Sequence, residues 1–199
     1  FCRSIDDLVR LACICAVLLT PIALEMVYEK LASSNLFAVL GGVAGQPNIR
    51  EGRGRAQGPF AHSILAGSVG ATALPLCLGL WHHYRHMAIL GAAASATMVV
   101  ASTSSGPLLS ALFSVFALLL WHRREHVRLL RWVALIGYIA LSLVMNASPY
   151  YLLARIDLTG GSTGYHRARL IESSVDHLNE WWLVGTDYTR HWMATGVSW

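Results

Sequence analysis

The sequence predicts an all-α fold, a polytopic integral membrane helix bundle of about five spanning helices with an amphipathic helix in an outer loop. The first observation is composition, because 55% of the 199 residues are hydrophobic and only 13% are charged, whereas soluble domains carry about a quarter charged residues. The second is that the apolar residues come in long runs. The third is that Trp81, Trp121 and Trp132 stand at the ends of runs, where aromatic residues anchor at the headgroup level. These observations exclude an ordinary cytosolic enzyme, a disordered tail and a secreted disulfide scaffold.

Each predicted span is an apolar stretch that approaches the roughly 20 residues needed to cross a bilayer. The five stretches are 8–27, 62–81, 87–104, 108–121 and 132–153. The fourth is short, and we expect its helix to extend by a turn into the neighbouring residues. It is separated from the third by Ser105-Gly106-Pro107, a predicted tight turn. We interpret residues 1–199 as a single membrane domain excerpted from a longer protein.

The orientation is predicted from segment 122–131, a short loop with four arginines. The positive-inside rule places such a loop in the cytoplasm. Alternation then places the polar segments 28–61 and 154–199 on the outer face. Those two segments hold eight of the fifteen cations. Either the orientation is reversed, or the outer arginines have an anionic partner that offsets the topological cost.

The densest basic segment contains Arg50, Arg53 and Arg55, separated by glycines and leading into the span that begins at His62. Glycine lets the backbone approach a ligand, and the guanidinium fork matches phosphate oxygens. We therefore predict a pliable phosphate-binding loop, with His62 as a titratable group at the membrane boundary. The alternative is a solvated loop whose arginines meet lipid headgroups, which such clusters commonly do.

The second candidate segment begins at Tyr165, where the spacing becomes helical. Ile171, Val175, Leu178 and Trp182 form one apolar stripe, which predicts a helix lying on the membrane surface. Arg167 and Arg169 fall in its first turns, where an anion would be favourable. The alternative is an amphipathic helix with ordinary surface charges.

Neither a metal motif nor a nucleotide-binding motif is recognisable, so no metal and no cofactor are expected. Glu25 and Glu29, one turn apart, are weak candidates for a base or a metal ligand, and His177 is expected to pack within its own loop. The cations form no concentrated basic face, so no nucleic-acid partner is expected.

The segment Arg55-Ala56-Gln57-Gly58-Pro59-Phe60-Ala61-His62 resembles the bacterial O-antigen ligase and O-antigen polymerase superfamily, whose outer loops often carry an Arg-x-x-Gly-x-Phe stretch before a helix. Segment 99–106, which ends in Ser105-Gly106, resembles the Ser-Arg-Gly segment that precedes a span in that family. Segment 167–186 resembles its large periplasmic loop. Two departures are clear. Ser105 replaces the usual arginine, and no position from 177 to 199 matches the functional histidine of that loop, which we expect beyond Trp199.

The resemblance implies an enzyme of cell-surface polysaccharide biosynthesis at the periplasmic face of the bacterial inner membrane. It would transfer a glycan from an undecaprenyl-diphosphate donor to an acceptor hydroxyl on a lipid or glycan, such as the lipid A–core of lipopolysaccharide, without a metal. The partners implied are that donor, the acceptor and membrane lipids. Since a diphosphate leaving group develops negative charge, arginines are the groups available to stabilise it. We rank Arg55 first, followed by Arg169 and Arg167, with Arg50 and Arg53 beside Arg55; His62 is the candidate for proton transfer.

Two other functional classes compete with this hypothesis. A transporter or exporter of an anionic lipid or polysaccharide precursor would need ionisable residues near mid-span or a broken helix, and Pro75 is the single plausible mid-span break. A scaffold without chemistry leaves the outer arginines unexplained.

Overall fold

The structure is a computed structural model that describes residues 4–50, 52–145, 151–152 and 164–192. For residues 50, 122, 164–167 and 190 it describes the backbone. The chain divides into two compact units, residues 1–125 and residues 126–199. Each unit is described by itself. Within the described residues the chain is mostly helical, with one small two-stranded sheet.

The first helix, α1 (Ile5–Ala32), extends five residues beyond the predicted end of its span. It begins at a capping box, in which Ser4 and Asp7 each bond the other's backbone N–H at 3.2 Å, an arrangement that satisfies two otherwise orphaned donors. It ends at Ser33, whose φ of 53° is left-handed. The last turns of α1 therefore carry Glu29 and Lys30 as helical residues, which the predicted end of the span at residue 27 did not anticipate.

The segment between the first two spans contains short elements rather than a continuous loop. A 3₁₀ helix, η1 (Leu36–Leu40), is followed by the antiparallel strands β1 (Asn48–Arg50) and β2 (Arg53–Arg55). Asn35 caps η1 by accepting a hydrogen bond from the Phe37 N–H at 2.8 Å. The predicted pliable loop of three arginines is thus wrong in part, because Arg50 lies in β1 and Arg53 and Arg55 lie in β2, and the two strands pair as a hairpin.

Three further helices complete the first unit: α2 (Ser63–Gly79), α3 (Arg85–Ala101) and α4 (Ser105–Leu120). The turn η2 (Leu80–His82) joins α2 to α3. Helix α2 passes Pro75 without a break. The predicted turn Ser105-Gly106-Pro107 is instead the first turn of α4, where proline is tolerated because its missing N–H has no helical partner. The expected extension of the fourth apolar helix by a turn of neighbouring residues is confirmed, because α4 begins at Ser105.

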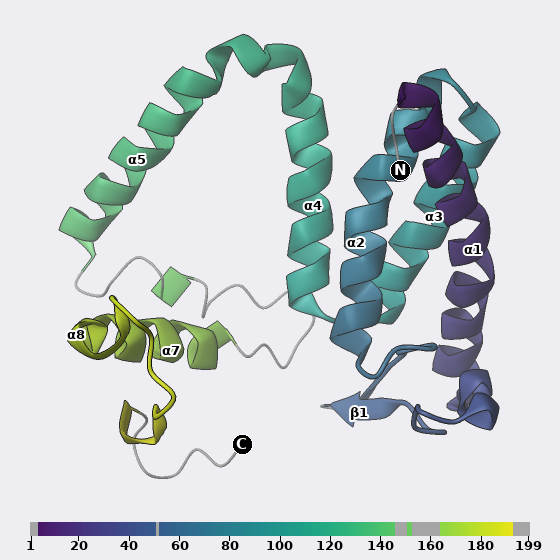
Figure 1. Cartoon of the computed structure of the whole chain (residues 1–199), viewed down its shortest axis with the longest axis horizontal. Helices are drawn as coiled ribbons and strands as arrows, with labels where there is room; N and C mark the ends of the chain where they lie inside the picture. The colour runs from purple at the N-terminus through teal and green to yellow at the C-terminus, as the bar shows by residue number, and fades with distance from the viewer. Residues whose placement is uncertain (1–3, 51, 146–150, 153–163, 193–199) are drawn as a thin grey trace. The chain divides into compact units, whose positions relative to one another are not determined.

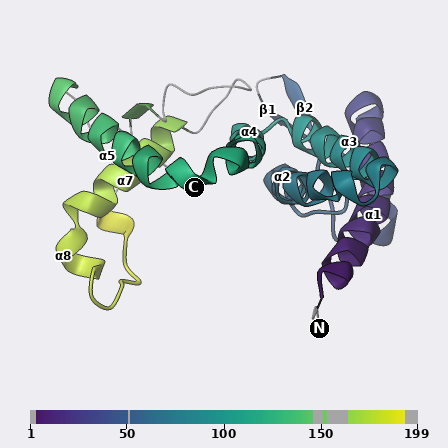
Figure 2. The ribbon, with the colours of Figure 1, turned by 90° about the horizontal axis from the view of Figure 1, so that it is seen from above.

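Small residues bring the helices of the first unit close together. Helix α3 packs against α1 and α2, and α4 packs on α2 (Figure 2). A Cβ atom at Gly70 would lie 2.7 Å from the Ser95 carbonyl oxygen, and one at Gly91 would lie 2.7 Å from the Ala16 Cβ. One at Gly67 would overlap the side chain of Ser102. The suitability of these glycines for close helix packing is confirmed.

The basic segment 122–131 is helical rather than an open loop. It forms η3 (Trp121–His126), which is kinked at Arg123, and the first turns of α5 (Val127–Val144). The fifth apolar helix therefore begins five residues before the predicted span, and residues 146–150 and 153 of that prediction lie outside the described residues. Helix α5 includes Arg128 and Arg131, and arginine is a good helix former.

Three of the described helices are long and apolar enough to cross a membrane: Ile5–Ala32, Ser63–His82 and Arg123–Val144. The apolar helices Arg85–Ala101 and Ser105–Leu120 are shorter, with 17 and 16 residues. The prediction of apolar membrane helices is confirmed in this coarser form.

The second unit contains, besides α5, the helices α7 (Gly164–Asp176) and α8 (Leu178–Trp181) and the turn η5 (Arg190–Trp192) (Figure 1). A helix beginning near Tyr165 is confirmed. Its predicted continuation to Trp182 is wrong, because His177 has φ −105° and ψ 28° and divides it into α7 and α8. The apolar stripe is consequently split between two helices.

Candidate functional site

Strands β1 and β2, which we call the arginine hairpin, lie at the end of the first unit where α1 and α3 finish and α2 begins (Figure 1). Its register pairs Arg50 with Arg53 and Asn48 with Arg55. Gly52 closes the turn with a φ of +75°, a conformation that glycine adopts without steric cost. Arg53 is exposed and Arg55 is half-buried. The hairpin therefore supplies cations from a defined backbone.

The residues that follow the hairpin are anchored by buried groups. The Ala56 N–H donates to the Ala101 carbonyl at 3.2 Å. The N–H groups of Gln57 and Gly58 both donate to Glu29 Oε2, at 2.9 and 2.8 Å. The Gly58 carbonyl accepts from Asn35 Nδ2 at 2.8 Å. Hydrogen bonds to a carboxylate are stronger than neutral ones, so this end of α1 fixes the segment between Arg55 and His62.

The turn between α3 and α4 carries the second polar surface of the site. Thr103 has a φ of 47°, which is an outlier for a β-branched residue, and such strain concentrates at functional sites. Its hydroxyl accepts from Lys30 Nζ at 2.9 Å and lies 3.3 Å from the Gly54 carbonyl oxygen. Arg55 Nε makes a long hydrogen bond of 3.5 Å to the Ser102 carbonyl.

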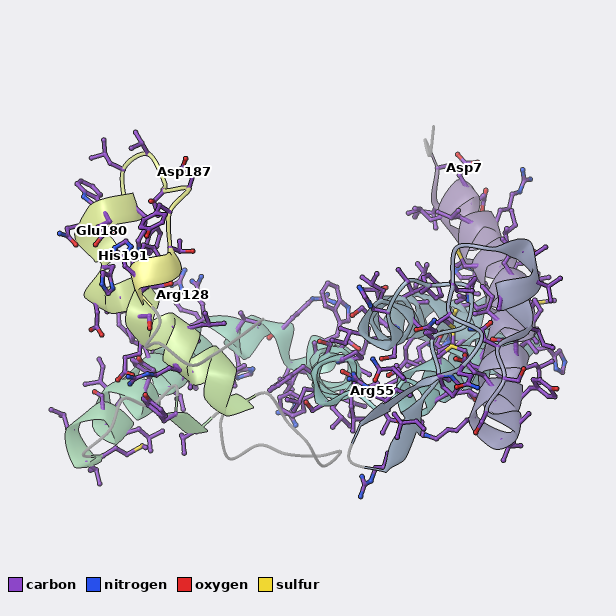
Figure 3. All side chains as sticks on the ribbon, turned by 90° about the horizontal axis from the view of Figure 1, so that it is seen from below. Asp7, Arg55, Arg128, Glu180, Asp187 and His191 are labelled. Carbon is purple, nitrogen blue, oxygen red and sulfur yellow. The ribbon has the colours of Figure 1, made fainter. Side chains whose placement is uncertain are left out.

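Three cations consequently gather at this end of the first unit. Arg53 lies close enough to Lys30 to interact with it electrostatically, and Arg55, labelled in Figure 3, contacts the same turn that binds Lys30. We call Lys30, Arg53 and Arg55 the cationic cluster. The hairpin segment around Arg55 and the turn that precedes Ser105 thus lie against each other.

An apolar groove of about 360 Å³ lies between α1 and α3, and Lys30 of the cationic cluster is part of its lining. Its lining is almost entirely apolar, and the ammonium-bearing Lys30 is its one charged side chain. The lining residues are Val27, Lys30, Leu31, Ala96, Thr97, Val100 and Ala101. An elongated apolar chain with an anionic end fits this combination of surfaces.

His62 is the residue immediately before α2 and is exposed. The prediction that it stands at a helix start is confirmed. Its side chain makes no capping hydrogen bond. A role in proton transfer stays a prediction.

The arginines of the second candidate segment have a different setting. Arg169 Nη1 lies 2.7 Å from Glu172 Oε2, which also accepts a hydrogen bond from the Tyr151 hydroxyl at 2.6 Å. The Tyr151 bond, followed by that from Arg169, lowers the pKa of Glu172 below its ordinary value. Arg169 is therefore already paired with a carboxylate. The side chain of Arg167 lies outside the described residues, so a diphosphate contact from it stays a prediction.

Sequence reasoning missed Lys30 as a site residue because the chain was expected to leave the helix at Val27. A signal was present: Lys30 is the single lysine of the chain, and it directly follows Glu29 and lies five positions after Glu25 at the same helix end. Glu25 and Glu29 have a structural role that was not anticipated. Glu29 holds Gln57 and Gly58, and Glu25 Oε1 accepts from the Leu36 N–H at 3.1 Å.

Comparison with known proteins adds no relative to these observations, since no family model, curated protein or solved structure matches the chain.

Proposed function

We propose that the chain is a membrane glycan ligase or polymerase that transfers a glycan from an undecaprenyl-diphosphate donor to an acceptor hydroxyl. The proposal places the reaction at the periplasmic face of the bacterial inner membrane. The observation that carries it is the apolar groove between α1 and α3, whose lining includes Lys30, the residue that contacts the same turn as Arg55 in the cationic cluster. A polyprenyl chain needs an apolar surface, and its diphosphate needs cations at the end of that surface.

The proposed glycan transfer requires, besides these surfaces, a base and cations at the leaving oxygen. The acceptor hydroxyl oxygen attacks the anomeric carbon of the donor sugar, and a new glycosidic C–O bond forms. The bond between that carbon and the diphosphate oxygen breaks, and its electron pair leaves with undecaprenyl diphosphate. The hydroxyl proton passes to a base, for which His62 is our candidate among the described residues. Preorganised cations that face the leaving oxygen lower the barrier, because charge develops there in the transition state.

Within the cluster we assign Arg55 the first role. Arg55 is a half-buried residue beside the strained turn at Thr103, and a partly desolvated cation interacts more strongly with an anion than a solvated one. Arg53 and Lys30 supply further charge, and Arg50 stands opposite Arg53 in the hairpin register. Arg169 ranks below these residues because Glu172 already neutralises it.

The test is complementation of cells that lack the corresponding ligase or polymerase, using the full-length gene. We expect Arg55→Ala to reduce polymer transfer by about 100-fold, the loss typical of removing one group that stabilises developing charge, and Arg55→Lys to restore part of it. Arg85→Ala is the matched control, because Arg85 begins α3 at the opposite end, with its guanidinium 5.1 Å from the Trp81 ring centroid. Transfer by Arg55→Ala at the wild-type level, with equal protein in the membrane, would remove Arg55 from the mechanism.

A transporter or exporter of an anionic lipid or polysaccharide precursor is the second candidate function. The observation that favours it is the burial of Glu25 and Glu29 within α1, with relative exposures of 7% and 0%, because ionisable residues inside spanning helices often mark substrate pathways. Both carboxylates instead hold loop backbone. Translocation of the donor without formation of a new glycosidic bond would favour the transporter.

A further inference from the structure

Three metal-binding side chains converge in the second unit. They are His177, at the junction of α7 and α8, Glu180 in α8, and His191 in η5. One ligand atom from each lies within 4.8 Å of the other two. Among the described residues this is the one group of three histidine, cysteine or acidic side chains that lies so close together. Figure 3 shows Glu180 and His191 directed toward each other.

The donor set suits zinc. Two imidazole nitrogens and one carboxylate oxygen are the ligands that catalytic zinc sites commonly use, with the fourth position open to water or another ligand. Tetrahedral coordination at ordinary zinc–ligand lengths separates neighbouring donor atoms by about 3.3 Å. His191 Nε2 and Glu180 Oε2 are 2.8 Å apart, and no pair among the three donors is separated by more than 4.8 Å, so the donor atoms lie near this spacing.

The proton on His177 is placed by a backbone carbonyl. Its Nδ1 lies 2.9 Å from the Ser173 carbonyl oxygen, which can only accept a hydrogen bond. In the neutral ring Nδ1 therefore carries the proton and Nε2 keeps its lone pair. A metal-binding histidine ordinarily makes this bond with its second nitrogen, because it fixes the tautomer and the orientation of the ring.

Aromatic side chains hold the other two donors. Trp192 Nε1 donates to Glu180 Oε2 at 3.0 Å. The Trp192 ring stacks on His177, with centroids 5.3 Å apart and planes at 18°, and Tyr188 stacks on His191 at 5.3 Å and 17°. The left-handed Gly185, with φ +79°, turns the chain back so that η5 reaches α8. Each ligand is thus oriented by a partner outside the donor set.

An ordinary ion pair between Glu180 and His191 would explain only part of this arrangement. It accounts for the 2.8 Å contact, but it requires neither His177 nor the hydrogen bond that leaves His177 Nε2 available. We propose that His177, Glu180 and His191 form a zinc-binding site, with an exposed coordination position left for water or an external ligand. The site is independent of the cationic cluster, and the proposal does not rest on the proposed function.

The experiment measures Zn²⁺ binding to the purified full-length protein in detergent by competition with a chromogenic chelator. We expect one Zn²⁺ per chain, with affinity reduced about tenfold or more by His177→Gln, Glu180→Gln or His191→Gln. Trp192→Phe, which removes the hydrogen bond to Glu180, should reduce affinity about 10- to 100-fold, the usual loss when a group that orients a metal ligand is removed. Far-ultraviolet circular dichroism of each variant serves as the control that its helices are retained.

His83→Gln is the matched control, since His83 lies in the histidine-rich turn between α2 and α3 and should bind Zn²⁺ like the wild type. The ligand exchange His191→Cys provides a positive signal: with Co²⁺ in place of Zn²⁺ it should retain binding and add a thiolate-to-cobalt charge-transfer band. Equal affinity in wild type and His191→Gln would overturn the site, as would an equal loss in His83→Gln or a cobalt complex of His191→Cys without the thiolate band.

Discussion

Glu29 and Gly58, 29 positions apart, are joined by a hydrogen bond of 2.8 Å from the glycine N–H to the carboxylate. The same oxygen accepts the N–H of Gln57 at 2.9 Å. Gly58 has a φ of +57°, and a Cβ there would lie 3.1 Å from Met26 Cγ. A buried acid on α1 and a glycine in the left-handed region therefore determine together where the segment between the hairpin and α2 lies.

Replacing Glu29 by alanine should destabilise the first unit by about 3 kcal/mol, because hydrogen bonds to charged groups contribute about 1.5–3 kcal/mol each and their loss leaves two buried donors unsatisfied. Thermal unfolding of the purified protein in detergent measures the effect. Glu29→Gln should lose less, since the amide oxygen still accepts. If Glu29→Ala unfolds with the wild-type midpoint, the carboxylate does not anchor the segment.

Gly67→Ala should destabilise the protein by about 1–3 kcal/mol, as overpacking of a tight interior typically does. The added Cβ would overlap the Ser102 side chain and approach Pro107 Cβ to 2.9 Å. Gly79→Ala in the same helix is the matched control, because no atom lies within 4 Å of the position of its Cβ, and alanine there is neutral or favourable. Equal unfolding midpoints for the two variants would contradict close packing at Gly67.

The contact between Tyr151 and Glu172 should give the second unit a stability that decreases at both ends of the pH scale. The Tyr151 hydroxyl, with Arg169, lowers the pKa of Glu172, and Glu172 raises the pKa of Tyr151. The contribution of Glu172 is lost as pH falls through its lowered pKa, and that of Tyr151 is lost as pH rises through its raised pKa.

An ultraviolet absorbance titration tests this pair. The difference between wild type and Tyr151→Phe isolates the ionisation of Tyr151, which should occur above the ordinary value of about 10. In Glu172→Gln the same difference should move toward the ordinary value, because the neighbouring negative charge is gone. A Tyr151 titration that is identical in both backgrounds would show that the contact does not form in solution.

Glycan transfer should persist after exhaustive chelation of metals, because the proposed leaving-group stabilisation uses Lys30, Arg53 and Arg55. The measurement is polymer transfer in membranes before and after treatment with a strong chelator. His191→Gln, tested in parallel, should transfer normally. Loss of transfer that Zn²⁺ restores in wild type but not in His191→Gln would contradict a purely cationic mechanism and link the zinc site to the reaction.

Local composition was enough to predict the helices, since each apolar run from Ile5 to Val144 forms one and glycines such as Gly70 and Gly91 mark their contacts. Boundaries were less predictable. The helical spacing continues through Glu29 and Lys30, and again through Arg128, where hydropathy alone indicated an end. The division at His177 was also missed, because the apolar stripe continues on both sides of a residue whose ring bonds the carbonyl four positions earlier.

The cations of the candidate site could be predicted from the sequence, but the way they are brought together could not. Arg53 and Arg55 stand out in the sequence, but the hydrogen bonds from the Gly58 N–H to Glu29 and from Lys30 to Thr103 join residues 29 and 73 positions apart. Such pairs depend on how helices pack, which no local pattern specifies. The meeting of His177, Glu180 and His191 likewise depends on the chain reversal at Gly185.

Gly67 lies under Ser102, and the Ser102 carbonyl is the acceptor for Arg55. The separation of two helices in the interior thereby sets the position of the guanidinium at the rim. A substitution at Gly67 should therefore displace the carbonyl that binds Arg55, so a residue with no charge of its own can change the position of a cation in the proposed site.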